Sequence, residues 1–274
     1  MDFPGATSDR EQAGYLVVGA PLDRSASGRP GARFGPEAVR AGARHFEEYD
    51  PATGRSFSDC AVADHGTVGT PGAIGDPVEY SEYLHSVIAE AVRDDFVPLV
   101  IGGEHAVSPP VARAVDPDVV VVFDAHLDLR DAYAGDPYSH ATATQRMLES
   151  ADRAVILGAR AGSAAEYDRA SGDDIQVLTC EAVADWTPDF TDERVYCSLD
   201  IDVLDPAFAP ATGTPEPFGL PPRVLRDALR RVAPYADGFD VVEVTDRDHG
   251  QTATLAAKLL RAFVFAHAAS DGAA

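Results

Sequence analysis

The sequence predicts a three-layer α/β/α sandwich around a mostly parallel sheet. Short apolar segments rich in β-branched residues alternate with longer segments whose apolar residues recur at spacings of three and four, as in amphipathic helices. The short segments are continuously apolar, as in Val-Val-Val-Val-Phe at 119–123. A strand of this kind needs cover on both faces, which a parallel sheet between two layers of helices provides.

Each expected strand is an apolar run that ends near a Gly, Pro or Asp. In chain order, the expected strands are 15–20, 96–101, 119–123, 154–157, 195–199 and 239–244. Helical periodicity marks the segments between and after them, which are 37–46, 80–94, 140–151, 222–232 and 252–267. Neither an internal repeat nor a linker rich in Gly and Ser divides the chain. We therefore expect residues 1–274 to form one domain.

The composition is strongly acidic. Against 45 Asp and Glu there are 22 Lys and Arg, which gives a net charge of −23, and Lys258 is the single lysine. Nucleic acids and anionic membranes are polyanions that bind faces rich in Lys and Arg, so we expect neither as a partner. A lysine-poor acidic surface is typical of halophilic proteins, and we expect a halophilic archaeal source. The N-terminal segment lacks the pattern of a signal peptide and no apolar run approaches 18 residues, which predicts a soluble cytoplasmic protein.

Carboxylates and imidazoles follow the strands at the edge where parallel sheets bind ligands. Gly-Gly-Glu-His at 102–105, Asp-Ala-His-Leu-Asp at 124–128 and Asp-Ile-Asp at 200–202 each follow a different strand. Glu243 lies near the end of another. In extended backbone, alternate residues project to one side, so the side chains within each segment should converge.

Six of these side chains predict a metal centre. Carboxylates held together repel one another unless cations lie between them, and four Asp with two His match two divalent ions that share carboxylates. Oxygen-rich coordination favours Mn²⁺ or Mg²⁺, the imidazoles favour Mn²⁺, and the lack of thiolates weighs against structural Zn²⁺. We predict two Mn²⁺ per chain, with the ligands His105, Asp124, His126, Asp128, Asp200 and Asp202.

Three motifs resemble the signatures of the ureohydrolases, the arginase and agmatinase family. They are Gly-Gly-Glu-His (102–105), Asp-Ala-His-Leu-Asp (124–128) and Ser-Leu-Asp-Ile-Asp-Val-Leu-Asp-Pro (198–206). The likeness extends across nearly the whole chain, from Gly-Ala-Pro at 19–21 to Thr-Ala-Thr-Leu-Ala-Ala at 252–257. It implies an arginase-like fold with about eight strands in a mixed but mostly parallel sheet. It also implies two Mn²⁺, hydrolysis of a guanidino group to urea, and homotrimers or homohexamers.

The resemblance also implies metal ligation. His105 and Asp128 would bind one metal, His126 and Asp202 would bind the other, and Asp124 and Asp200 would bridge them. Two adjacent ions lower the pKa of a shared water, so that it can attack the guanidinium carbon near neutral pH. Asp128 would orient that nucleophile.

Further roles follow from the same resemblance. His140, in a Ser-His segment, would give a proton to the departing amine, a role suited to the near-neutral pKa of histidine. Glu243 would hold the guanidinium through the planar fit between a carboxylate and a guanidinium. Thr212 and Glu216 belong to a threonine-rich turn that would line the pocket.

The expected substrate is a small cationic guanidino compound, with agmatine first, guanidinobutyrate second and arginine third. Residues 129–138 resemble the loops of agmatinases and lack the Asn- and Ser-rich segment with which arginases hold an α-carboxylate. Acids such as Asp131, Asp136 and Glu216 suit a substrate that is cationic at both ends. Arg130 could instead hold a carboxylate and admit guanidinobutyrate.

Two further interpretations remain open. A di-metal phosphoesterase also carries Asp-x-His and Gly-x-x-His segments, but it requires a Gly-Asp segment and an Asn ligand that cannot be placed here. A catalytically silent homologue could serve as an assembly or regulatory subunit, although it would have no need of a complete ligand set.

Overall fold

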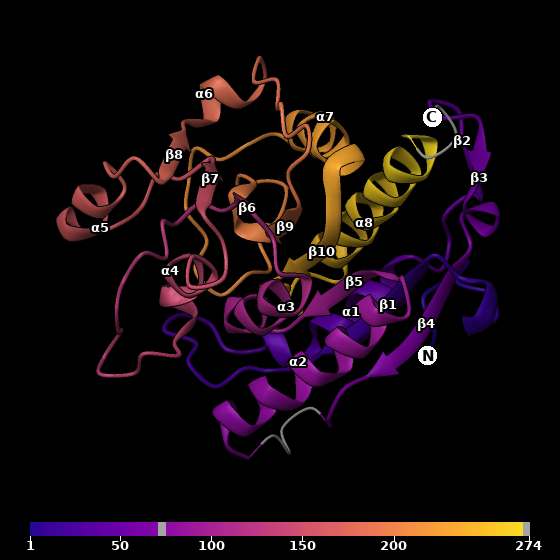
Figure 1. Cartoon of the computed structure of the whole chain (residues 1–274), viewed down its shortest axis with the longest axis horizontal. Helices are drawn as coiled ribbons and strands as arrows, with labels where there is room; N and C mark the ends of the chain where they lie inside the picture. The colour runs from indigo at the N-terminus through magenta and orange to yellow at the C-terminus, as the bar shows by residue number, and fades with distance from the viewer. Residues whose placement is uncertain (71–74, 271–274) are drawn as a thin grey trace.

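A parallel sheet lies at the centre of the computed structural model, which describes residues 1–70 and 75–270 (Figure 1). Every strand pairing in this sheet is parallel across the described residues. From one edge to the other, its strands are β4 (Val62–Thr67), β1 (Tyr15–Ala20), β5 (Val97–Gly102), β10 (Ala236–Val242), β9 (Val195–Asp200), β6 (Val119–Phe123), β7 (Arg153–Leu157) and β8 (Ile175–Leu178). The predicted fold class is confirmed, and this sheet is parallel rather than mixed.

Helices cover both faces of the sheet (Figure 1). One layer consists of α2 (Pro77–Arg93), α3 (Ser108–Val115) and α4 (Ala143–Met147), and the other of α1 (Gly35–Gly42), α7 (Pro222–Val232) and α8 (Gln251–Ser270). Two short helices follow β7 and β8, namely α5 (Ala164–Arg169) and α6 (Cys180–Val183), and a small antiparallel hairpin joins β2 (Tyr49–Asp50) to β3 (Arg55–Ser56). Within the described ranges, no helix combines the length and the apolar character that crossing a bilayer requires.

The central strand β6 shows why the apolar runs are continuous. Val119 and Val121 join the core beneath α1, α7 and α8, whereas Val120 and Val122 join the core beneath α2 and α3. All four side chains are fully buried. Burying each valine contributes roughly 1.5–3 kcal/mol to the stability of the fold. Because alternate side chains point to opposite faces, this one strand packs against both helix layers.

Some boundaries differ from the prediction. The helix expected over 140–151 is a 3₁₀ turn at His140–Thr142 followed by α4 alone. Beyond Met147 the chain closes a turn in which both the N–H and the hydroxyl of Ser150 donate to the Met147 carbonyl. The sequence also failed to predict the two edge strands, β4 and β8, whose residues are less completely buried than those of β6. The interpretation of residues 1–274 as one domain stays a prediction, and residues 71–74 and 271–274 lie outside the described ranges.

Candidate metal centre and active site

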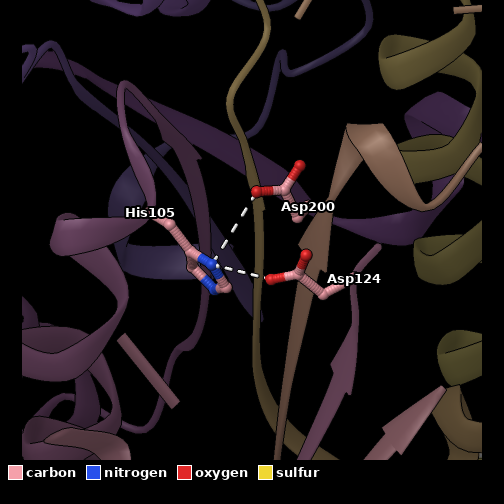
Figure 2. Close-up of side chains that lie close together, drawn as sticks. All are labelled: His105, Asp124 and Asp200. Carbon is pink, nitrogen blue, oxygen red and sulfur yellow. Dashed lines mark ion pairs between the residues drawn. The ribbon is translucent and has the colours of Figure 1, made fainter. Parts of the chain in front are cut away.

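The first half of the candidate metal centre gathers side chains from three strand ends. His105 begins the turn after β5, Asp124 directly follows β6, and Asp200 ends β9. Figure 2 shows the His105 ring facing both carboxylates. His105 Nδ1 lies 3.1 Å from Asp124 Oδ2 and 3.7 Å from Asp200 Oδ2. The ligand atoms of these residues lie within 4.8 Å of one another, close enough to share a metal ion.

The second half shares Asp124 with the first. His126 Nδ1 lies 3.0 Å from Asp202 Oδ2 and 3.5 Å from Asp124 Oδ1, and these three residues form a second group within 4.8 Å. One oxygen of Asp124 therefore faces His105 and the other faces His126. This is the arrangement expected of a carboxylate that bridges two metal positions.

Local hydrogen bonds turn these carboxylates toward the centre. Asp124 Oδ1 accepts the His126 backbone N–H at 2.6 Å, and Asp200 Oδ1 accepts the Asp202 N–H at 2.8 Å. Such bonds from a side chain to the backbone two residues on stabilise tight turns. The alternation had suggested an extended strand from Asp124 to Asp128, but the chain is not extended there. Asp128 has a left-handed backbone (φ 50°), and its Oδ2 still lies 2.9 Å from His105 Nδ1.

The buried acids lack matching positive charge. Burial alone would lower the pKa of the His105 imidazole, but Asp124 and Asp128 outweigh it and raise this pKa well above its ordinary value. Burial, together with neighbouring carboxylates, raises the pKa of Asp200 well above its usual range and that of Asp128 to about 6. Asp124 Oδ2 is buried and accepts no hydrogen bond of good geometry. Divalent cations would supply the missing charge and a partner for this oxygen, so the donor set fits two metal ions.

A buried polar chain supports His105 from behind. Its Nε2 lies 3.1 Å from Ser198 Oγ, and Ser198 donates to Asp240 Oδ1 at 2.7 Å. The Tyr196 hydroxyl donates to the other oxygen of Asp240. These contacts orient the ring with Nδ1 toward the candidate metal position. The sequence prediction missed this support, although a charged Asp240 within an apolar run was the available signal.

Glu243 and His140 lie beside the metal ligands. Glu243 follows β10 with a left-handed backbone (φ 62°), and its Oε1 accepts the His105 backbone N–H at 2.9 Å. Burial and the neighbouring Glu104 raise the pKa of Glu243 to about 8. His140 Nδ1 lies 3.8 Å from Glu243 Oε1. Burial, with the charges of His105 and His126, lowers the pKa of His140 to about 4, below the near-neutral value expected from the sequence for a proton donor.

A cavity of about 290 Å³ adjoins this centre. The residues that line it are Ser27, His126, Asp128, Arg130, Tyr133, His140, Ala141, Ala161, Gly162, Glu166 and Thr214. From the threonine-rich turn, it is Thr214 that reaches the cavity wall. Thr212 is instead buried behind the turn, and Glu216 offers its backbone carbonyl to Arg160 at 2.7 Å. Neither Thr212 nor Glu216 is among the residues that line this cavity, and their contact with substrate stays a prediction.

Comparisons with known proteins agree with this geometry. Residues 13–266 match the sequence model of the arginase family. An agmatinase of Pyrococcus horikoshii is 36% identical over 273 residues, covering 95% of this chain and 93% of the relative. An N(1)-aminopropylagmatine ureohydrolase of Thermococcus kodakarensis is 34% identical over 272 residues, with 95% and 92% covered. The crystal structure of an agmatine ureohydrolase of Thermoplasma volcanium is similar with a TM-score of 0.92 and 31% identity, covering 99% of this chain and 96% of that one. The chain therefore belongs to the arginase family of ureohydrolases, which are hydrolytic enzymes.

Proposed function

We propose that this enzyme hydrolyses agmatine to putrescine and urea at a centre that binds two Mn²⁺. The observation that carries the proposal is the pair of His/Asp clusters that share Asp124 beside a polar cavity. Oxygen-rich ligation with two imidazoles supports Mn²⁺ over Mg²⁺. His105 and Asp128 would hold one ion, His126 and Asp202 the other, and Asp124 and Asp200 both. When bound, the ions supply activated water and stabilise the charge that develops during its attack.

The side chains beside the ligands would bind the guanidinium and move a proton. Glu243 presents a buried carboxylate, which suits two parallel hydrogen bonds from a planar guanidinium. Binding of this cation would favour the ionised form of Glu243. His140 Nδ1, 3.8 Å from Glu243 Oε1, would lie near the nitrogen that departs. As the C–N bond breaks, His140 would protonate that nitrogen, which leaves as the amine of putrescine, while the guanidinium carbon remains in urea.

The outer wall of the cavity supports a substrate with a cationic far end. Arg130 Nη2 lies 3.0 Å from Glu166 Oε2, and the Arg130 guanidinium stacks over Tyr133 at 5.3 Å. Glu166 therefore compensates the cation that could otherwise attract the carboxylate of guanidinobutyrate. The nearby exposed acids Asp131 and Asp136 add negative potential at this end.

The test is urea release from four guanidino compounds by the Mn²⁺-loaded enzyme. Agmatine should give the highest kcat/KM, ahead of guanidinobutyrate and then arginine. The panel includes N(1)-aminopropylagmatine because one relative is named for it, and a preference for this longer cation would change the substrate but leave the reaction intact. Arginine outperforming agmatine by tenfold or more would contradict the assignment.

We further propose that the protein works in the cytoplasm of a halophilic archaeon, in polyamine metabolism, as a homotrimer or homohexamer. The family resemblance supports the assembly. The net charge of −23 and the single lysine support salt adaptation and oppose nucleic acid or membrane partners. Light scattering coupled to size exclusion in molar KCl would test the assembly, and a monomer there would contradict it.

A further inference from the structure

Ser27 lies on the loop between β1 and α1 and contacts the proposed proton donor. Its Oγ is 2.9 Å from His140 Nε2, and both residues line the cavity. On the same loop, Ser25 Oγ accepts the His140 backbone N–H at 2.8 Å. The other ring nitrogen, Nδ1, is the one near Glu243. One loop thus holds the backbone of His140 and one end of its ring.

Although Ser27 is exposed, its loop is anchored to a buried carboxylate. Glu104 is only 1% exposed, and its Oε2 accepts the backbone N–H groups of Arg24 and Ser25, both at 2.8 Å. Glu104 directly precedes His105 in the chain. The position of the loop is therefore tied to the turn that carries a metal ligand.

The residues after Ser27 are fixed as well. The Arg29 N–H donates to the Gly213 carbonyl at 2.9 Å. Gly28 packs so closely that a Cβ added there would lie 2.3 Å from the same carbonyl oxygen. Because the chain is held on both sides of Ser27, at Ser25 and at Arg29, Ser27 has little freedom to leave His140.

We propose that Ser27 is a positioning residue that fixes the ring orientation of His140. The Ser27 hydroxyl can donate to Nε2 or accept from Nε2–H, so in either case it holds this nitrogen and leaves Nδ1 on the side of Glu243. When the ring is protonated, both nitrogens donate, and Ser27 Oγ can accept from Nε2–H and stabilise that form. The consequence for catalysis rests on the function proposed above, whereas the contact itself does not.

The kinetic test is Ser27→Ala in the Mn²⁺-loaded enzyme. We expect kcat for urea release to fall roughly three- to tenfold, the range for one lost hydrogen bond, with KM changed less than twofold. The limb of the kcat profile that reports loss of the His140 proton should move to lower pH because the protonated ring loses its acceptor. Ser27→Thr keeps the hydroxyl and should retain most of kcat. The matched control is Ser171→Ala, an exposed serine that donates to the Asp168 carbonyl far along the chain, and it should change nothing.

A second readout does not depend on turnover. In Mg²⁺-loaded protein labelled with ¹⁵N-histidine, the His140 ring signals can be assigned by their absence in His140→Asn. Ser27→Ala should shift the Nε2 signal, because this nitrogen loses its hydroxyl partner. If the wild type releases no urea from any guanidino compound and this shift still occurs, the proposed function fails and the positioning role stands. Unchanged ring signals in Ser27→Ala, or kcat losses as large in Ser27→Thr as in Ser27→Ala, would overturn the inference.

Discussion

Asp124 is the residue on which the geometry of the centre depends. Its two oxygens face two different imidazoles. His105 follows β5 and His126 follows β6, so the two rings come from different strands. An asparagine at this position would keep the size of the side chain but remove the charge and one acceptor. Because both candidate metal positions use this residue, a change here should weaken both.

The first prediction is that Asp124→Asn is the most damaging single substitution among the ligands. Metal content after reconstitution should fall from close to two ions per chain to one or fewer. Loss of electrostatic stabilisation of this kind costs roughly 10²- to 10³-fold in kcat. Elemental analysis and urea release measure the two effects. Asp152→Asn, an exposed acid, is the control, and a variant at Asp124 that kept two ions and full activity would refute the shared site.

A second prediction concerns Arg130 and Glu166 at the outer wall. Arg130→Gln leaves Glu166 without its cation, so the ratio of kcat/KM for agmatine over guanidinobutyrate should rise about two- to tenfold, as expected for a partly exposed ion pair. Glu166→Gln frees Arg130, so the ratio should fall. A change of the same sign in both variants would show that this pair does not determine specificity.

The convergence of the six candidate ligands could be predicted from the sequence, but the residues that support them could not. The ligands occur directly after three apolar runs, and parallel strands bring such positions to one edge. Ser27 and Asp240 reach the site from other segments, and only the packing of a loop or of a neighbouring strand brings them there. The left-handed backbone of Glu243 is likewise set by tertiary contacts, since glutamate rarely adopts it.

At the scale of elements, apolar content decided which strands could be predicted. β6 is buried on both faces and reads as an unbroken apolar run, whereas β4, at the sheet edge, reads Val-Ala-Asp-His-Gly-Thr. An edge strand has less apolar surface to bury, so its sequence resembles a loop. The central strands position the candidate metal centre. Its residues could therefore be predicted from the sequence although the edge strands could not.

The pairing of β9 and β10 gives a third prediction, at Asp240. Tyr196 and Ser198 donate from β9 to the two oxygens of this buried carboxylate on β10. An amide offers one acceptor oxygen and would turn its NH₂ group toward a hydroxyl donor, so Asp240→Asn should lower the free energy of unfolding by about 1–3 kcal/mol. It should also loosen the His105 ring and weaken metal binding.

The effect at Asp240 should depend on pH in a defined direction. Burial raises the pKa of Asp240 in the folded protein, although His105 and the hydroxyl donors act against burial. The folded state therefore holds this proton more tightly, and the stabilisation is complete below the ordinary Asp value of about 3.9 and lost as pH rises through the raised value. The stability advantage of wild type over Asp240→Asn should shrink as pH rises from about 4, as measured by denaturant unfolding. For Asp152→Asn the difference should stay flat, and a difference growing with pH at Asp240 would contradict the sign.

For the whole molecule, charge is the dominant property. The net charge of −23 is spread over a chain in which acids outnumber bases by two to one, and Lys258 is the single lysine. Bound divalent ions would neutralise only a small part of this charge, at one buried centre. The exposed acids must therefore be screened by solution ions, because their mutual repulsion opposes the compact state.

The final prediction is that melting temperature rises steeply with salt. The screening length falls from about 10 Å at 0.1 M salt to about 3 Å at 1 M, so repulsion among surface acids should largely disappear over this range. Thermal unfolding from dilute buffer to molar KCl measures the rise. A variant with three exposed acids neutralised, Asp152→Asn, Asp173→Asn and Asp185→Asn, controls for general effects of salt on folding. It should melt higher than wild type in dilute buffer and gain less from KCl. Equal gains in both proteins would assign the rise to general salt effects, and a flat wild-type curve would contradict salt adaptation while leaving the metal chemistry untouched.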